Sequence, residues 1–200
     1  AMAQDDIKRF LAYSSISQMG YLFLGLASVS TLGVAGAMFH YVSHGLGKCI
    51  LFSVAGILIC QVGTRSIKKL GGLAAKMPAT AVLCIIGFLT IAGVPPTSGF
   101  MSKWILFLGV FSTALSDSST SMLVVGIIAI IMTIITVAYA FWTIRRVFFG
   151  PLPEELKDVK EAPAIMLAPL FLLAVVTILV GIYPRAVTDF LIQFLSNILP

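Results

Sequence analysis

The fold of this chain depends on the stretch Gly93-Val94-Pro95-Pro96-Thr97-Ser98-Gly99, which interrupts a long apolar run over residues 79–115. Two consecutive prolines remove two backbone N–H donors and prevent a helix from continuing. The run is therefore either a tight hairpin of two membrane spans or one span broken at Pro95 and Pro96. Four further apolar runs are each close to or above the roughly 20 residues that a helix needs to cross a bilayer. They cover residues 7–27, 33–62, 122–149 and 164–183.

The composition indicates a membrane protein. Of the 200 residues, 59% are hydrophobic and 10% are charged, and the mean hydropathy is +1.06. Soluble domains carry about 25% charged residues, so a soluble core could not bury this much apolar surface. The same numbers exclude a disordered chain and a secreted disulfide scaffold. Cys49, Cys60 and Cys84 are far apart within apolar runs, which is typical of small core residues rather than of disulfides or metal ligands.

The positions of the positive charges decide between a hairpin and a broken span. With five spans, one side of the membrane holds ten basic residues and the other side holds only Arg185, whereas a sixth crossing would destroy this asymmetry. Cytoplasmic loops carry the excess of Lys and Arg, so the net charge of +5 indicates membrane topology and not nucleic-acid binding. The ten residues are Lys8, Arg9, Arg65, Lys68, Lys69, Lys76, Arg145, Arg146, Lys157 and Lys160.

We therefore predict an all-α integral membrane protein with five transmembrane helices, the third broken at Pro95-Pro96. We expect it in the plasma membrane of a prokaryote, with the basic loops in the cytoplasm. Residues 150–163 are polar and bounded by prolines, which predicts a cytoplasmic loop. Residues 184–200 have apolar side chains at helical spacing, which predicts a short amphipathic helix that lies at the outer interface or packs on a neighbour.

Four ionisable side chains fall inside the predicted spans, and all of them are basic. They are His40, His44, Lys48 and Lys103, while all eight carboxylates lie outside the spans or at their edges. A charged side chain at the centre of a span costs about 2.5–3.5 kcal/mol on insertion scales. We therefore expect these residues to have a function.

His40, His44 and Lys48 follow one another at intervals of four residues, which places them on one helix stripe about 12 Å long. Histidine exchanges a proton near neutral pH, and a lysine removed from water can join it, so the stripe predicts a proton relay within the bilayer. One alternative is that the histidines are ordinary core residues. A metal site is another, because histidines four apart can share an ion. However, Lys48 would repel the ion and no carboxylate completes the shell, so we predict no metal.

Lys103 follows the break, which leaves backbone carbonyls unpaired around residues 90–94. Thr97 or Ser98 can cap the half-helix that begins after it. Discontinuous helices with polar termini recur at ion sites in transporters, so we expect Lys103 to be functional. The alternative is a structural kink with a lysine that snorkels to the surface.

The first span also has a polar face, which we expect to serve mainly helix packing. It comprises Tyr13, Ser14, Ser15, Ser17, Gln18 and Tyr21.

Four stretches in order carry a resemblance to a known family. They read DIKRFLAYSSISQMGY (residues 6–21), FHYVSHGLGK (39–48), KLGGL (69–73) and AGVPPTSGFMSK (92–103). They resemble the antiporter-like subunits of respiratory complex I, of Mrp-type Na⁺/H⁺ antiporters and of membrane-bound hydrogenases. Gln18 departs from the pattern, since some relatives carry histidine there.

The resemblance implies an H⁺-translocating membrane subunit of a redox-driven complex. It implies relay roles for His40, His44 and Lys48, and for Lys103 the role of terminal link toward the outer side. It also implies that residues 1–149 form the second of two inverted repeats, with four spans, followed by the loop at 150–163 and by a final span and amphipathic tail at 164–200.

The sequence has no motif for haem, flavin, nucleotide or an iron–sulfur cluster, so we expect no cofactor. The expected partners are the lipid bilayer, other membrane subunits, including a chain that supplies the missing first repeat, and peripheral redox subunits. Nucleic acid is not expected. Two alternatives remain open: a subunit of a Mrp-type antiporter, and a structural half-subunit that conducts nothing.

Overall fold

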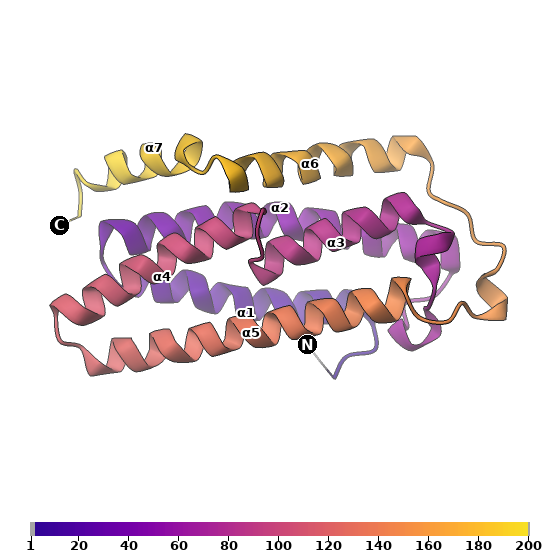
Figure 1. Cartoon of the computed structure of the whole chain (residues 1–200), viewed down its shortest axis with the longest axis horizontal. Helices are drawn as coiled ribbons and strands as arrows, with labels where there is room; N and C mark the ends of the chain where they lie inside the picture. Colours follow the sequence, from indigo (N-terminus) through magenta and orange to yellow (C-terminus); the bar gives the residue numbers. More distant parts are fainter. Residues whose placement is uncertain (1–2, 200) are drawn as a thin grey trace.

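The computed structural model describes residues 3–199, and within them the fold is all-helical, as predicted (Figure 1). Three short 3₁₀ turns lie in the connections, at Ile67–Lys69 (η1), Leu73–Ala75 (η2) and Glu154–Leu156 (η3). The α-helices are α1 (Ile7–Ala27), α2 (Thr31–Val62), α3 (Pro78–Ala92), α4 (Ser98–Ser116), α5 (Thr120–Phe148), α6 (Ala164–Ile182) and α7 (Arg185–Leu195).

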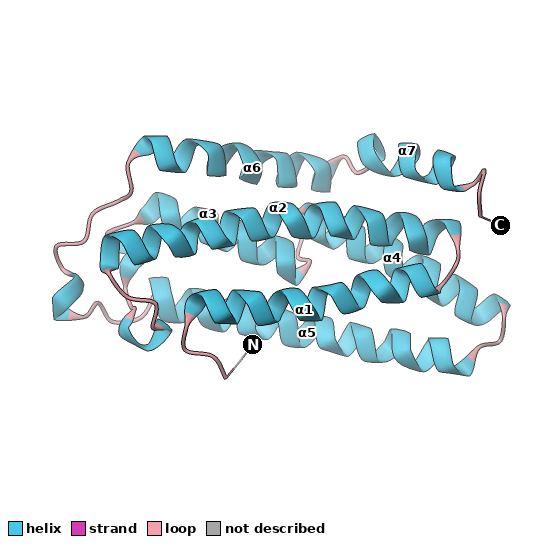
Figure 2. Cartoon of the chain, turned by 180° about the vertical axis from the view of Figure 1, so that it is seen from behind, coloured by secondary structure: helices cyan, strands magenta, loops and turns pink. Residues whose placement is uncertain are grey.

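The helices run along the long axis of the molecule, with α2 at the centre in contact with α1, α3, α4, α6 and α7. Figures 1 and 2 show that α3 and α4 follow one another along this axis instead of folding back. The segment is therefore a broken helix and not a hairpin. The amphipathic helix α7 continues beyond α6 and packs on the first turns of α2, where Leu195 meets Val34 and Ala35.

Four helices are long and apolar enough to cross a membrane: α2, α4, α5 and α6. The chain is thus an integral membrane protein. The helix α3 is apolar but has only 15 residues. The helix α1 has 21 residues but lies outside this group, since serines, a glutamine and tyrosines lower its hydropathy.

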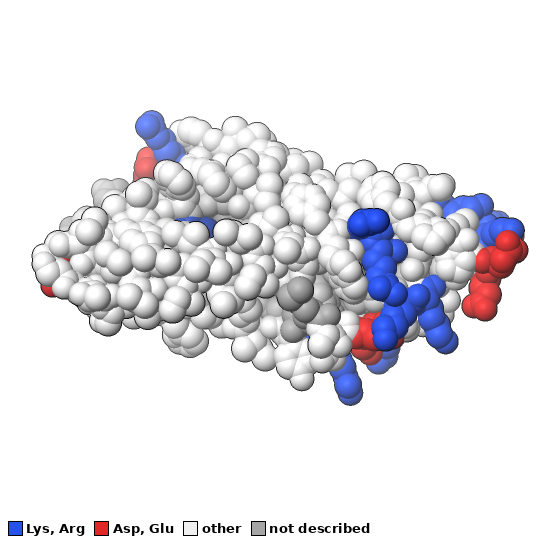
Figure 3. All heavy atoms as spheres, turned by 60° about the horizontal axis from the view of Figure 1, so that its bottom comes forward, with Lys and Arg blue, Asp and Glu red and all other residues white. Residues whose placement is uncertain are grey.

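Most of the Lys and Arg side chains gather at one end of the molecule, where α1 begins and α2 and α5 end (Figure 3), whereas Arg185 lies toward the other end and Lys48 and Lys103 are buried in the bundle. A large apolar core lies toward this end and packs residues such as Phe10, Leu51 and Phe88 between the helices. The middle of the bundle also buries polar side chains, among them His40, Lys48 and Lys103.

The connection between α5 and α6 is fixed to the bundle by Glu161. Its carboxylate accepts hydrogen bonds from the backbone N–H groups of Ala79 (2.7 Å) and Thr80 (3.3 Å) and from the Thr80 hydroxyl (2.6 Å). These donors belong to the first turn of α3, which has no side-chain cap of its own. A carboxylate at a helix N-terminus also interacts favourably with the helix dipole.

We predict that Glu161→Gln lowers the free energy of unfolding by about 1–3 kcal/mol, because a neutral amide replaces a carboxylate that accepts three hydrogen bonds from α3 and a fourth from the Ala162 N–H. Thermal unfolding of the chain in detergent, followed by circular dichroism, measures the effect. Glu155→Gln is the matched control, since Glu155 is exposed in the same connection. Equal melting temperatures for the two variants would contradict the role given to Glu161.

Candidate functional site

Lys48 is buried in the middle of the bundle, with 7% of its surface exposed. Its ammonium donates a hydrogen bond to the Leu11 carbonyl (2.6 Å) and another to the Ser14 hydroxyl, both on α1. The Ser14 hydroxyl in turn donates to the same carbonyl (2.8 Å). No carboxylate among residues 3–199 lies within ion-pair distance of Lys48. The ammonium is therefore held by neutral oxygens.

His44 and His40 continue from Lys48 along the same face of α2. Both are buried, and their ring centroids are 6.2 Å apart. His40 Nδ1 lies 3.2 Å from the Ser102 hydroxyl of α4, which connects the stripe to the second half of the broken helix. In the described part of the chain, His40 Nε2 and His44 Nδ1 have no hydrogen-bond partner. Buried polar atoms are normally satisfied by protein or water, so these atoms mark positions for internal water.

Lys103 lies at the break itself. Its ammonium donates to the carbonyls of Ile91 (3.1 Å) and Ala92 (3.4 Å), the last residues of α3. It also lies 4.6 Å from the centroid of the Tyr21 ring. A cation is favourable both at a helix C-terminus and over an aromatic face. Because only 4% of Lys103 is exposed, the structure excludes a lysine that snorkels to the surface.

The geometry of the break depends on glycines. The helix α3 ends at Gly93, whose φ of +76° favours glycine. A Cβ at Gly99 would lie 1.7 Å from the Thr90 carbonyl oxygen, and one at Gly181 would lie 2.1 Å from the Pro96 oxygen. The helices α3, α4 and α6 thus meet too closely here for any side chain at these positions.

The prediction that Thr97 or Ser98 caps α4 is confirmed for the position of Thr97 but not for a capping hydrogen bond from either side chain. Thr97 occupies the N-cap position, but its hydroxyl donates back to the Val94 carbonyl (2.8 Å). The Ser98 hydroxyl is hydrogen-bonded to the hydroxyls of Ser43 (2.7 Å) and Thr177 (2.6 Å). The physical reason is that the break supplies unpaired carbonyls and hydroxyl partners that compete for these side chains.

The polar face of α1 does more than the expected helix packing. Ser14, Gln18 and Tyr21 are buried on one stripe, and two of them contact a predicted relay lysine, Ser14 at Lys48 and Tyr21 at Lys103. Both amide atoms of the fully buried Gln18 lack a partner in the described part of the chain. The same is true of the hydroxyl of Tyr139 on α5, which lies beside Ser14 and Gln18.

Sequence reasoning missed Tyr139 and Ser102 as parts of this site. The signal for Tyr139 was its spacing from Thr136 in an otherwise apolar run, while nothing in the sequence pointed to Ser102. The structure nevertheless buries all four predicted residues in one band: Lys48, His44 and His40 follow one another on α2, and the Tyr21 ring, which contacts both His40 and Lys103, links them to the break. Within residues 3–199 no group of three or more His, Cys, Asp or Glu side chains lies close enough to hold a metal ion.

The fold and this buried band define an integral membrane protein with a polar interior. Residues 1–136 match the family described as "NADH:quinone oxidoreductase/Mrp antiporter, TM". The chain belongs to this family, as the sequence motifs predicted.

The chain is similar to F(420)H(2) dehydrogenase subunit M of Methanosarcina mazei, with 38% identity over 193 residues that cover 96% of this chain and 37% of the relative. A chain in the archaeal membrane-bound sulfane sulfur reductase superposes with a TM-score of 0.80 and 36% identity, over 89% of this chain and 28% of that one. A chain of respiratory complex I from Thermus thermophilus gives a TM-score of 0.86 and 28% identity, over 98% of this chain and 40% of that one. The chain thus spans less than half the length of these relatives.

We predict that Ser14→Ala lowers the free energy of unfolding by about 1–3 kcal/mol, because the buried Lys48 ammonium loses one of its two oxygen ligands. The melting temperature in detergent measures this loss. Ser17→Ala on the same helix is the control, since Ser17 is exposed. If both variants unfold at the same temperature, Ser14 does not support Lys48.

Proposed function

We propose that this chain forms part of an H⁺-translocating membrane subunit in a redox-driven, complex I-like respiratory or hydrogenase complex. One observation carries the proposal: the four ionisable side chains inside the bundle form a single buried band. This band connects the middle of α2 with the break between α3 and α4.

The chemistry of the band suits proton transfer. The Lys48 ammonium is held by a carbonyl and a hydroxyl, so it can release its proton without leaving an unpaired buried carboxylate. Within residues 3–199, His44 and His40 each have a ring nitrogen without a hydrogen-bond partner, which can accept or pass a proton through water. The proton then reaches Lys103, whose ammonium is stabilised by the carbonyl end of α3.

The two lysines also give partner subunits a means of control. Like charges in a medium of low dielectric repel strongly, and no carboxylate among residues 3–199 neutralises either lysine. A proton that arrives at Lys48 therefore favours release from Lys103. A partner that changes the charge or hydration near one lysine would drive the proton along the band.

We further propose five membrane crossings, formed by α1, α2, the broken helix α3–α4, α5 and α6, with the basic end in the cytoplasm. The helix α1 can cross although it is less apolar, because its polar stripe faces Lys48 and Lys103. Residues 1–149 would then be the second of two inverted repeats. Lipid or further polypeptide would cover the exposed apolar side chains of α5.

The identities of the partners distinguish a redox-driven pump from a Mrp-type antiporter. The relatives named above include a dehydrogenase subunit, a sulfane sulfur reductase and a complex I chain, which favours the redox-driven complex. Extraction of the native assembly in mild detergent and identification of all co-purifying chains tests this. Recovery of peripheral redox subunits supports the pump, and recovery of Mrp-type membrane subunits alone supports the antiporter.

We predict that Lys48→Ala and Lys103→Ala each reduce H⁺ translocation by about tenfold or more. Removal of either lysine interrupts the proton relay, and an increase of about 1.4 kcal/mol in the activation barrier for proton transfer already lowers the rate tenfold. The native assembly, reconstituted in liposomes, is energised by its electron donor, and internal acidification is followed with a pH-sensitive dye. Lys69→Ala, at an exposed lysine, is the control. Pumping at the wild-type rate by fully assembled Lys48 and Lys103 variants would favour a structural half-subunit that conducts nothing.

A further inference from the structure

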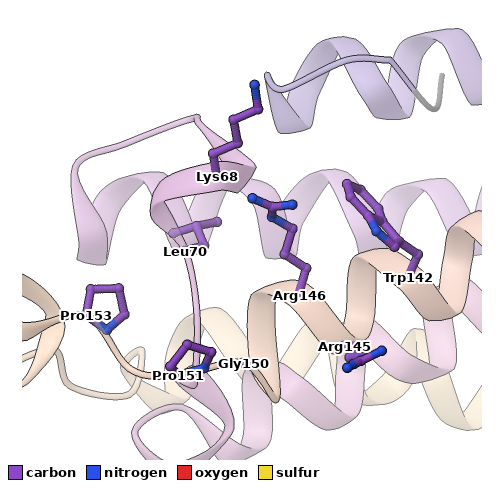
Figure 4. Close-up of a pocket in the computed structure, with 8 residues that line it drawn as sticks. All are labelled: Lys68, Leu70, Trp142, Arg145, Arg146, Gly150, Pro151 and Pro153. Carbon is purple, nitrogen blue, oxygen red and sulfur yellow. The ribbon is translucent and has the colours of Figure 1, made fainter.

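The basic end of the molecule contains a hollow of about 400 Å³ that the relay does not use (Figure 4). Arg145 and Arg146, in the last turn of α5, line it together with Lys68 of η1. Trp142 forms another wall, one turn earlier on α5. The remaining lining comes from Leu70, Gly150, Pro151 and Pro153. Three cationic side chains and an indole ring thus line one concave surface.

The cations around this hollow have no carboxylate within ion-pair distance among residues 3–199. The side chains of Lys68, Arg145 and Arg146 form no ion pair and no hydrogen bond there, and the Arg146 guanidinium lies 5.4 Å from the centroid of the Trp142 ring. Asp5 is near Lys68 and Arg146, but its carboxylate already accepts the Ser66 hydroxyl (2.6 Å) and the Lys68 backbone N–H (2.9 Å). The hollow therefore keeps unpaired donors suited to an anion.

A second hollow, of about 290 Å³, lies on the other side of Arg145. Its lining is almost entirely apolar and comes from α3 and α5, with Ile85, Phe141, Ile144 and Phe149. In Figure 4, the side chains of Arg145 and Arg146 leave α5 in different directions, and Arg145 lines both hollows. A basic hollow and an apolar hollow that share one arginine fit a ligand with an anionic head and an apolar tail.

We propose that these two adjacent hollows bind one anionic phospholipid. Its phosphate lies in the basic hollow beside the Arg146 guanidinium, which can donate two parallel hydrogen bonds, and Arg145 lies where the two hollows meet. Its glycerol region lies against Trp142, a residue type that prefers the depth of the headgroups. One acyl chain occupies the apolar hollow along Phe141 and Ile144. Basic pockets on the cytoplasmic side of membrane proteins bind anionic headgroups in this way.

The test uses the native assembly in nanodiscs that contain a small fraction of photoactivatable lipid, with a diazirine in the acyl chain near the headgroup. Phosphatidylglycerol and phosphatidylcholine carrying the same diazirine are compared at equal mole fraction, and labelled peptides are identified by mass spectrometry. We expect phosphatidylglycerol to label residues 141–149 in excess, by on the order of tenfold. Arg145→Gln/Arg146→Gln is expected to remove the excess. Lys157→Gln/Lys160→Gln, which removes the same charge from the neighbouring connection, is expected to leave it unchanged.

Three results would overturn the proposal: equal labelling by the two lipids, an excess that survives the double arginine variant, or an excess that disappears in the lysine control. Inorganic phosphate at constant ionic strength separates a lipid from a soluble anion. An excess that persists in phosphate supports the lipid, and one that phosphate abolishes assigns the hollow to a soluble anion instead.

If the double variant does not assemble, the single variants Arg145→Gln and Arg146→Gln replace it, and each is expected to lose part of the excess.

Discussion

The hydrogen bonds from the Lys103 ammonium to the carbonyls of Ile91 and Ala92 are the interaction on which the centre of this bundle depends. A helix that stops inside a membrane leaves carbonyls unpaired, and the hydrocarbon offers them no donor. A buried ammonium is equally costly without acceptors. The ammonium supplies the donors that the carbonyls lack, and the carbonyls supply the acceptors that the ammonium needs. The break and the lysine therefore require one another. Gly93 allows the helix to end there, and Gly99 lets α4 begin close enough for Lys103 to reach back.

Lys48 is also bound by neutral oxygen atoms. A carbonyl and a hydroxyl of α1 accept its hydrogen bonds in place of the carboxylate that usually neutralises a buried lysine. Two cations solvated by neutral oxygens remain sensitive to each other and to any charge brought near them. The histidines between them have unpartnered nitrogens in the described part of the chain. The interior therefore has acceptors and donors for protons but no permanent counter-ion that would fix where the charge resides.

The helices could be predicted closely because the bilayer sets their length and composition. The run at residues 7–27 coincides with α1, and the run at 33–62 differs from α2 by two residues. His40, His44, Lys48 and Lys103 could be found because ionisable residues are rare inside apolar runs. Their ligands could not be found in this way. The Leu11 carbonyl has no signature in a sequence, and the hydroxyls of Ser14 and Thr97 choose their partners only when the helices have packed.

Carboxylates are present at the basic end of the molecule, unlike in the interior, and they bind mainly backbone N–H groups. Asp5, Asp6 and Glu161 all bind backbone N–H groups, and Lys157–Glu154 is the one ion pair among residues 3–199. The acids are therefore used to fix connections and helix starts, and they leave most of the lysines and arginines without a partner. An excess of cations that is not neutralised internally is what sets orientation in a membrane, and it is also what an anionic headgroup can recognise. The acids of this end thus serve the fold by binding backbone N–H groups, and the bases that they leave unpaired serve the proposed topology and the proposed lipid site.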